Sequence, residues 1–460
     1  MHHGSGPRYT SLLDRQFAAK LGDYAARVAE RYPWIDMWTP VNEPLTTARF
    51  SCMYGHWYPH KKSFRDFLLA LSHECQGALE AMRAIREVNP GALHVVTEDL
   101  GKTFSTPAMA YQARHENHRR WLSLDMLTGR VDERHPFWPM LMEAGVDPAV
   151  LADMNSQEAA PDLIGINHYL TSERYLDERR ERYPDQPVGT NGVDSYVDLE
   201  AVRMPHLAGK TGPLARLREA WERYAIPLAV TEVHHGCSRE EQVRWLAEVW
   251  NAAEQLRREG GDIRAVTLLS LFSNVDWRSL LTRREGIYDV GAFDTRGGKL
   301  RPTMVARAAK SLASGTPLAH PALEGRPWWR RSERFYIGGK PCMDHHLGRQ
   351  PLLITGATGT LGQAFARLSH HRGLRHVVTD RAALDITDQQ SIERALDRIQ
   401  PWAVINTAGF VRVPEAEHQP DACFRINTTG PELLAAARRA STAKARRRPR
   451  TASWRSLPTP

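Results

Sequence analysis

The alternation of strand-like and helix-like segments between residues 17 and 315 constrains the fold of this 460-residue chain more than any other feature. Apolar residues recur at helical spacing over residues 17–32 and 64–88. Continuous apolar runs typical of strands occur at residues 34–41, 93–100, 162–170, 226–233 and 265–272. Strands separated by helices predict parallel βα units. Polar residues gather where each strand pattern stops, which is the edge of a parallel sheet that carries the chemistry in such folds.

Residues 316–350 interrupt this alternation with Pro, Gly, Arg and His, and we interpret them as a linker anchored by Trp328, Trp329 and Phe335. A second α/β pattern then starts with the run PLLITGATGTLGQAFARL. The sequence therefore predicts a first domain over residues 1–315, a linker over residues 316–350, a second domain over residues 351–437 and a basic tail over residues 438–460.

The formal charge of +8 is concentrated at the end of the chain. The tail holds eight Lys or Arg and no acidic residue, which leaves 53 basic and 53 acidic side chains in residues 1–437. Its Arg, Ala, Ser, Pro and Thr content is typical of a shifted reading frame, and the alternative is a genuine basic tail for nucleic acid. Trp454 is the one aromatic residue there, which disfavours nucleic acid as a partner.

Composition and residue spacing exclude several other classes of protein. A content of 42% hydrophobic and 25% charged residues is ordinary for a globular chain, and no run approaches the roughly 18 apolar residues of a membrane span. The five scattered cysteines form neither a disulfide framework nor a C-x-x-C pattern, which predicts a reducing, cytoplasmic location. The histidines lack an H-x-x-x-H spacing with a partner acid, so we predict no metal site.

Two glutamates stand at the ends of different predicted strands, Glu43 in W-T-P-V-N-E-P and Glu232 in P-L-A-V-T-E-V. Two carboxylates that project from separate strands into one barrel mouth suit glycoside hydrolysis. One protonates the leaving oxygen, and the other attacks or stabilises the anomeric carbon. A glutamate at a strand end also serves as a salt-bridge or helix-entry residue, so the spacing alone leaves both interpretations open.

Four motifs occur in order: W-x-x-V-N-E-P, G-I-N-H-Y-L-T-S, L-A-V-T-E and S-L-F-S-N-V-D-W. Over about residues 1–315 the chain resembles the family 1 glycoside hydrolases, which are β-glucosidase-like, retaining (β/α)₈ barrels of the TIM-barrel type. The resemblance implies that Glu43 is the general acid/base, that Glu232 is the nucleophile and that Tyr169 orients Glu232. A retaining mechanism places the two carboxyl groups about 5–5.5 Å apart, and the barrel itself needs no cofactor.

The resemblance also implies a set of sugar-binding residues, which are His3, Asn42, Asn167, Tyr169, Asp276 and Trp277. Asn42 would hold the sugar 2-hydroxyl, and the Asp276–Trp277 pair would grip the far side of the glycone. The chain departs from the family pattern at Gly4, His168, Val233, His234, Leu269 and Asp276.

One departure concerns the start of the chain. If the segment H-H-G-S-G-P is the end of the third barrel strand, Met1 falls inside that strand and the first two βα units are absent. Parallel barrels close strand to strand, so we expect two exposed sheet edges. A misplaced start codon, a gene fragment and complementation by another chain would each explain this, and we favour a truncated gene model.

The second domain begins with a glycine-rich loop in a strand–turn–helix context. The loop G-A-T-G-T-L-G contains Gly356, Thr358, Gly359, Leu361 and Gly362. Glycines permit a tight turn and a close backbone approach to a pyrophosphate at a helix N-terminus. Asp380 ends the next predicted strand, close to the spacing expected for a ribose-binding acid. The pattern therefore predicts a partial Rossmann domain that binds NAD(P)H.

The continuation L-D-I-T-D, V-I-N-T-A and N-T-T-G-P resembles extended short-chain reductases of the dTDP-4-dehydrorhamnose reductase group, over about residues 351–437. The resemblance implies that Asp385 and Ile386 border the adenine, that Ala408 and Gly409 line the nicotinamide side, and that Asn427 supports the next strand. In that group the catalytic Tyr-x-x-x-Lys lies further along, and this chain has no Tyr after Tyr336. We therefore expect cofactor binding without completed reductase chemistry.

Together these patterns predict a carbohydrate-active fusion protein in which a β-glycosidase-like barrel precedes a reductase-like domain. Its expected partners are a small glycoside and a nucleotide-sugar, with no membrane, and the patterns give no oligomeric state. The alternative is a non-hydrolytic barrel that binds carbohydrate or acts as a scaffold, with activity only in a full-length reductase.

Overall fold

The computed structural model describes residues 6–156, 158–337, 340–341, 350–371 and 374–447. The chain divides into two compact units, Met1–Pro341 and Cys342–Pro460. The first unit therefore continues through residues that the sequence indicates as a linker.

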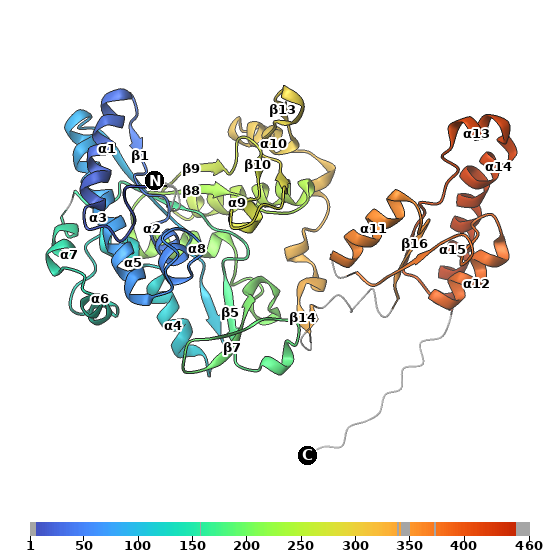
Figure 1. Ribbon diagram of the computed structural model, residues 1–460, viewed down its shortest axis with the longest axis horizontal. Helices are drawn as coiled ribbons and strands as arrows, with labels where there is room; N and C mark the ends of the chain where they lie inside the picture. Colours follow the sequence, from blue (N-terminus) through green and yellow to red (C-terminus); the bar gives the residue numbers. More distant parts are fainter. Residues whose placement is uncertain (1–5, 157, 338–339, 342–349, 372–373, 448–460) are drawn as a thin grey trace, which may run out of the picture. The chain divides into compact units, whose positions relative to one another are not determined.

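A curved parallel sheet of five strands, in the order β1-β2-β4-β8-β9, forms the centre of the first unit (Figure 1). The strands are β1 (Met37–Trp38), β2 (Leu93–Glu98), β4 (Leu163–Ile166), β8 (Leu228–Val233) and β9 (Ile263–Leu268). All four neighbouring pairs are parallel. Because all the strands run the same way, the residues that follow them meet at one edge of the sheet.

Helices pack around this sheet, as the apolar periodicity predicts. The long helix α3 (Phe64–Val88) begins after Ser63, whose hydroxyl accepts the Asp66 backbone N–H at 3.1 Å. It packs along α1 (Phe17–Arg31), and Gly77 lies so close to this helix that a Cβ would stand 3.0 Å from Phe17. The other main helices are α8 (Pro213–Tyr224), α9 (Arg239–Arg258) and α10 (Met304–Ala313).

Insertions after the strands add a second, smaller sheet with the order β3-β5-β7-β6. Its strands are β3 (Thr103–Ser105), β5 (Arg174–Asp177), β6 (Val188–Thr190) and β7 (Ser195–Glu200). The short helices nearby are α2 (Pro44–Ala48), the π-helical turn η1 (Arg49–Met53), α4 (Ala110–Arg119), α5 (Leu122–Leu127), α6 (Trp138–Ala144) and α7 (Pro148–Met154). Paired two-residue strands follow β9: β10 (Asn274–Val275) with β11 (Tyr288–Asp289), and β12 (Phe293–Asp294) with β13 (Arg301–Pro302).

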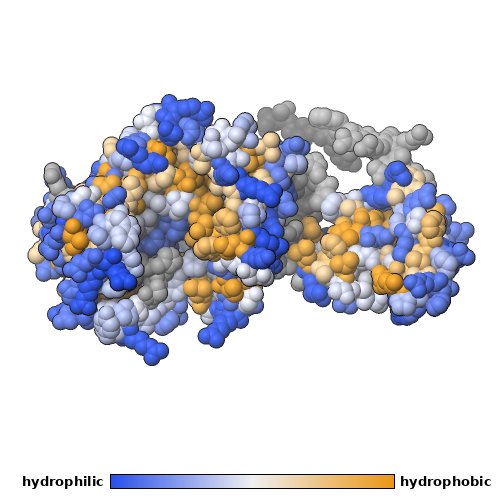
Figure 2. All heavy atoms as spheres, turned by 90° about the horizontal axis from the view of Figure 1, so that it is seen from above, coloured by the Kyte–Doolittle hydropathy of each residue, from blue (hydrophilic) through white to orange (hydrophobic). Residues whose placement is uncertain are grey.

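The edge strands of the five-stranded sheet are β1 and β9. Apolar side chains in or just after each edge strand are exposed. Met37 in β1 is 59% exposed, and Leu271 and Phe272 after β9 are 56% and 48% exposed. On the face of the molecule in Figure 2, apolar side chains gather in several groups between hydrophilic ones.

The segment after α10 packs on the first unit through its tryptophans. Trp329 is 2% exposed, and its indole N–H donates to Glu248 Oε2 at 2.6 Å. The indole N–H of Trp328 donates to His235 Nε2 at 2.8 Å. The segment contains the short 3₁₀ turns η7 (Pro321–Leu323), η8 (Trp328–Arg330) and η9 (Ser332–Arg334), then β14 (Tyr336–Ile337), which pairs with β15 (Lys340–Pro341).

The second unit is built on a three-stranded parallel sheet with the order β17-β16-β18. The strands are β16 (Leu352–Thr355), β17 (His376–Thr379) and β18 (Ala403–Ile405), and the helices are α11 (Thr360–His371), α12 (Gln389–Ile399), α13 (Val413–His418), α14 (Pro420–Phe424) and α15 (Gly430–Arg447), with a π-helical turn η10 (Arg425–Thr429). The core includes Leu353, Ile386, Ile392 and Leu434. Helix α15 continues into the predicted basic tail, where Arg438 donates to the Trp402 carbonyl at 2.8 Å.

No helix in the described ranges combines the length and the apolar character that a bilayer crossing requires.

Candidate active site

Glu43 lies where the first strand of the sheet turns into a helix. The bridge between Asn42 and Thr97 continues the pairing of β1 with β2, and Glu43 follows with a left-handed backbone (φ 47°, ψ 66°) at the N-cap of α2. The Thr97 hydroxyl accepts the Glu43 N–H at 3.2 Å and donates to Asn42 Oδ1 at 2.9 Å. A left-handed glutamate is strained, and these bonds with Thr97 hold the turn that presents its side chain.

Glu232 lies at the end of β8, with two neighbouring side chains donating to its carboxylate. The hydroxyl of Tyr169, from the segment after β4, donates to Oε2 of Glu232. The Asn42 side chain donates a further hydrogen bond to Glu232. Glu232 is 8% exposed and Glu43 is 4% exposed, so both carboxylates are largely withdrawn from water.

Asn167 connects the two halves of this site, because β4 lies between β2 and β8 in the sheet. Its Nδ2 donates to Glu43 Oε1 at 2.9 Å, and its Oδ1 accepts the Thr231 hydroxyl at 2.5 Å. Of the predicted residues, the structure thus brings Glu43, Glu232, Asn42, Asn167 and Tyr169 into one hydrogen-bonded group.

The surroundings of Glu43 and Glu232 shift their pKa values to different extents. Burial raises the pKa of Glu43 well above its ordinary value, and the charge of Glu232 raises it further. Burial also raises the pKa of Glu232, but the hydrogen bonds from Tyr169 and Asn42 oppose this rise. When the pair shares one proton, Glu43 therefore holds it and Glu232 is ionised.

Glu98 is a site residue that the sequence reasoning did not single out. It ends β2, is fully buried, and its Oε1 accepts the Leu45 N–H at 2.7 Å and the Ser123 hydroxyl at 2.5 Å. It thereby caps the first turn of α2 and fixes the helix that follows Glu43. Burial raises the pKa of Glu98 to about 8. The signal was the polar T-E-D segment at the end of the second strand.

Asp276 and Trp277 lie further out, in the turn after β10. Asp276 has a left-handed backbone (φ 61°), and its two oxygens accept the N–H groups of Ile287 at 2.7 Å and Glu285 at 3.1 Å. These hydrogen bonds from backbone N–H groups lower the pKa of Asp276. They also hold the turn in place around its carboxylate. The predicted residue His3 lies outside the described residues.

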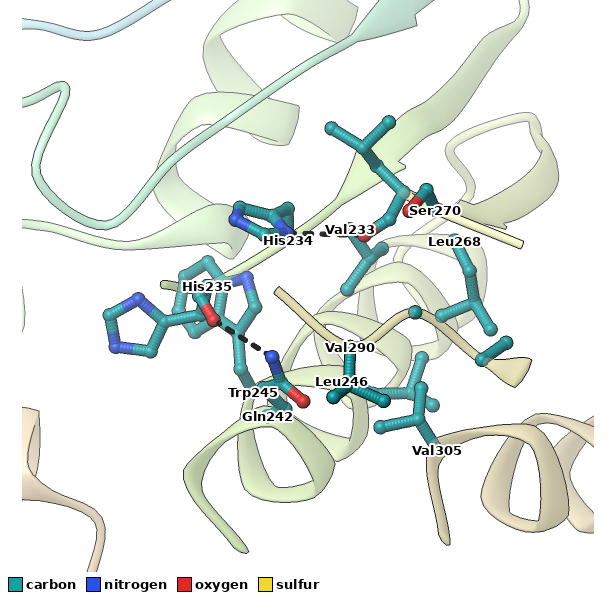
Figure 3. A pocket seen from close by; sticks show the side chains of 13 residues that line it. Val233, His234, His235, Gln242, Trp245, Leu246, Leu268, Ser270, Val290 and Val305 are labelled. Atoms are coloured by element: carbon teal, nitrogen blue, oxygen red, sulfur yellow. Dashed lines mark hydrogen bonds between the residues drawn. The ribbon is translucent and has the colours of Figure 1, made fainter. Parts of the chain in front are cut away.

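Three of the residues that depart from the family pattern lie close to Glu232 at the ends of β8 and β9. Val233, His234 and Leu269 line a small cavity between β8, β9 and α9, which Figure 3 shows from close by. His234 Nδ1 lies 3.3 Å from the Leu269 carbonyl oxygen. His168 is 3% exposed and packs against Trp245, and burial lowers its pKa to about 3, so it is a neutral core residue.

Within the described ranges, no three His, Cys, Asp or Glu side chains converge in a way that could hold a metal ion.

The glycine-rich loop of the second unit joins β16 to α11. Gly356 has a φ of +81°, and a Cβ there would stand 2.6 Å from Thr407 Oγ1. A Cβ on Gly362 would stand 2.0 Å from the Gly356 carbonyl oxygen. Both positions require glycine, and the exposed Thr358, Gly359 and Leu361 form the rim of the loop.

The other predicted cofactor residues follow the neighbouring strands. Asp380 is exposed after β17 and accepts the Ala383 N–H at 2.9 Å, and Asp385 Oδ1 accepts the Thr387 N–H at 2.9 Å. The Ile386 side chain is 4% exposed in the core, so its backbone is the part that can face a ligand.

Ala408 and Gly409 follow β18 on the same side of this sheet as the glycine-rich loop. Asn427 holds the next residue in place, because its side chain accepts the Phe410 N–H at 2.7 Å and donates to the Phe410 carbonyl at 2.9 Å. The segments after all three strands thus meet at one edge of the sheet.

Comparison with known families decides the class of the first unit. The sequence profile of glycosyl hydrolase family 1 matches residues 9–303. The chain belongs to glycosyl hydrolase family 1. The resemblance that the four motifs carry is therefore confirmed.

Solved family 1 structures share the fold of this glycosyl hydrolase family 1 member. The β-glucosidase from Thermotoga maritima, bound to a substituted glucoimidazole, superposes with a TM-score of 0.53 at 15% identity. The match covers 67% of this chain and 70% of that structure. Together with the curved parallel sheet, it shows a TIM-barrel-like glycosidase domain.

The second unit is similar to another family. The profile of the RmlD substrate binding domain matches residues 350–445. The dTDP-4-dehydrorhamnose reductase of Streptomyces griseus is 39% identical over 88 residues, which are 19% of this chain and 29% of that protein. The reductase of Aggregatibacter actinomycetemcomitans is 36% identical over 87 residues, 19% of this chain and 30% of that protein. The chain thus spans less than a third of these reductases' length, and the resemblance to their group is confirmed.

Proposed function

We propose that the family 1 domain is a retaining β-glycosidase in which Glu232 attacks the anomeric carbon and Glu43 protonates the leaving oxygen. In the second step Glu43, now ionised, takes a proton from water, and that water releases the sugar from Glu232. The observation that carries this proposal is that the two buried glutamates differ in their hydrogen-bond donors and in the charge near them. Tyr169 and Asn42 donate to Glu232, and the negative charge of Glu232 keeps a proton on Glu43.

Asn42 fits a second role in this mechanism. It lies between the two glutamates, and its amide is within hydrogen-bond reach of Glu232. A sugar 2-hydroxyl beside the attacked carbon would meet this amide, and hydrogen bonds to that hydroxyl strengthen in the transition state of glycoside hydrolysis. Asp276, Trp277 and His3 stay proposed sugar contacts in the outer part of the site.

For the second unit, we propose a partial Rossmann domain that binds NAD(P)H. The residues fit such a group: Gly356 and Gly362 leave no room for side chains where a pyrophosphate would approach α11. Asp380 is exposed at the end of the next strand, where a ribose hydroxyl would bind. When bound, the nicotinamide would supply a hydride, and a nucleotide-linked ketosugar would be the substrate of a complete reductase.

Hydrolysis is tested with a panel of aryl β-glycosides and the full chain. Glu232→Ala should lower kcat by on the order of 10⁴-fold or more, and Glu43→Ala should lower it by about 10²–10⁴-fold for a poor leaving group. The exposed Glu133→Ala is the matched control and should not change kcat. Glycoside release that does not depend on Glu232 would overturn the proposal.

Azide separates the two roles. In Glu232→Ala, azide replaces the missing nucleophile and should give an α-glycosyl azide by single inversion. In Glu43→Ala, azide should intercept the glycosyl-enzyme and give the β-glycosyl azide by double inversion. The opposite pair of products would exchange the two assignments.

The alternative is a barrel that binds carbohydrate without hydrolysing it. The observation in its favour is that both carboxylate oxygens of Asp276 already accept backbone N–H groups of its own loop. Sugar binding by the wild type with no release of aglycone from any glycoside would support this alternative.

A further inference from the structure

Two arginines, Arg49 and Arg119, meet at one end of the π-helical turn η1. Nη2 of Arg49 donates to the Tyr54 hydroxyl at 3.2 Å, and its guanidinium lies 5.5 Å from the centre of the Tyr54 ring. Nη1 of Arg119, from the end of α4, donates to the Met53 Sδ at 3.7 Å. Since Met53 and Tyr54 are adjacent, the two guanidinium groups come from different helices to the same place.

Neither guanidinium forms an ion pair with another residue in the described part of the chain, and both have neutral partners, a phenol and a thioether. Arg119 is 6% exposed, and Nε of Arg49 is buried without a hydrogen-bond partner. Charged groups withdrawn from water are costly unless an opposite charge compensates them. Among the described residues the cluster therefore has no direct ion-pair partner, and Asp99 and Glu116 compensate the charge of Arg49 only from a greater distance.

The nearby carboxylates are held by other groups. Glu116 accepts hydrogen bonds from Thr103 at 2.9 Å and from Gln112 at 2.9 Å. Asp198 pairs with Arg174 at 2.8 Å, and Asp99 accepts the Gly101 N–H at 3.1 Å. Each of these acids is thus bonded elsewhere, and none of the three forms an ion pair with Arg49 or Arg119.

The pKa directions of Arg119 and Tyr54 agree with a positive field at this place, whereas Tyr54, Asp99 and Glu116 raise the pKa of Arg49 against the effect of burial. Burial and then the charge of Arg49 lower the pKa of Arg119. Burial alone would raise the pKa of Tyr54, but Arg49 and Arg119 outweigh burial and lower it.

The cluster lies next to the catalytic pair, on the side of the general acid. Arg49 follows Glu43 by six residues along α2, which at about 1.5 Å per residue is ~9 Å. Asp99 influences the pKa of both Glu43 and Arg49, so it lies near both side chains. Phe50 and Trp57 add aromatic surface beside Arg49, with ring centres 5.0 Å apart.

We propose that Arg49, Arg119 and the Tyr54 hydroxyl form a subsite for an anionic group, a phosphate or a carboxylate, on the leaving-group side of the glycoside. Guanidinium groups suit both anions because their N–H donors match two oxygens at once. The link to a glycoside rests on the proposed function, whereas anion binding can be measured without turnover.

The first test is calorimetric titration of the full chain with inorganic phosphate and, separately, with acetate. We expect Arg49→Gln and Arg119→Gln to weaken binding of the preferred anion at least about 10-fold, and Arg119→Lys, which keeps the charge, to retain most of it. The control Arg134→Gln changes an arginine side chain that is 93% exposed and should bind as the wild type does. Absence of binding to both anions, or equal binding by all the variants, would overturn the subsite.

The second test compares aryl β-glycosides with a neutral and with a para-carboxylate leaving group. Arg49→Gln should lower kcat/KM for the carboxylate substrate at least about 10-fold more than for the neutral one. Arginine-dependent phosphate binding without hydrolysis of any glycoside would reject the proposed function and keep the subsite. Hydrolysis with equal losses for both substrates would reject the link to the leaving group.

Discussion

The hydroxyl of Tyr169 donates a hydrogen bond to Oε2 of Glu232 and so ties the segment after β4 to the end of β8. Burial and the charge of Glu232 raise the pKa of Tyr169, which keeps the hydroxyl protonated and able to donate. A hydrogen bond to the ionised form of a carboxyl group favours that form. Tyr169 therefore helps Glu232 to stay a nucleophile in a buried site.

Tyr169→Phe should raise the pKa of Glu232, because burial then acts without this donor. Glu232 must be ionised to attack, so the acid limb of the kcat/KM profile should move to higher pH. At the acid end the loss should be about 10- to 100-fold, the range for a hydrogen bond to a charged group. A pH–rate profile on an aryl β-glycoside checks the shift. The control Tyr111→Phe removes an exposed phenol bonded to Asp194 and should leave the profile in place, and an equal loss at every pH in Tyr169→Phe would contradict the prediction.

Glu98 should make the first unit less stable as the pH rises. Its pKa is about 8 in the folded chain because of burial and near the ordinary value of 4.5 when unfolded. Between these values the folded state holds a proton that the unfolded state has lost, so the unfolding free energy falls with rising pH. The decline from one such group is at most about 1.4 kcal/mol per pH unit. Glu98→Gln should remove this contribution.

Urea unfolding at pH 5 and pH 9, followed by tryptophan fluorescence, measures this effect. The difference in unfolding free energy between the two pH values should be smaller in Glu98→Gln than in the wild type. Glu133→Gln, at an exposed position, should keep the wild-type difference. An unchanged difference in Glu98→Gln would show that Glu98 does not titrate in this window.

The sequence predicted the strands that carry the site well, because buried parallel strands need continuous apolar runs. The runs that became β4 and β8 are examples, and Asn167 and Glu232 lie at their ends as the motifs indicate. The roles of Glu98 and Arg119 could not be predicted in the same way. The first depends on β2 lying beside the start of α2, and the second on α4 ending against η1.

In the outer part of the site and in the linker, too, the sequence pattern did not predict which contacts single side chains make. A motif match identifies Asp276 but not the left-handed backbone that turns its carboxylate to the amides of its own loop. Low apolar periodicity indicates a linker, yet Trp329 anchors that segment through Glu248, a residue 81 positions earlier. Long-range contacts of single side chains leave no periodic signal in the sequence.

The glycine-rich loop of the second unit should tolerate an added methyl group at one glycine and not at another. A Cβ on Gly362 would stand 2.0 Å from the Gly356 carbonyl oxygen, whereas a Cβ on Gly359 would stand 3.4 Å from it. Gly362→Ala should therefore displace the loop and abolish NADPH and NADH binding measured by calorimetry. Gly359→Ala should leave the backbone of the loop in place and weaken cofactor binding less than Gly362→Ala does. Equal affinities in both variants would show that the cofactor does not use this loop.

Arg216 and Arg218 lie two residues apart on α8 and pair with glutamates in opposite environments. Arg216 is 2% exposed and bonds to the fully buried Glu173 at 2.6 Å, whereas Arg218 pairs with Glu259 at the surface. Arg216→Met leaves a buried carboxylate without its partner and should cost about 3–5 kcal/mol of unfolding free energy at pH 8. Burial raises the pKa of Glu173 to about 7, so Glu173 can take up a proton at pH 5 and the loss should be smaller there. Arg218→Met should cost much less at both pH values, because water solvates Glu259. Urea unfolding of the three proteins at both pH values checks this, and equal losses in the two variants would contradict it.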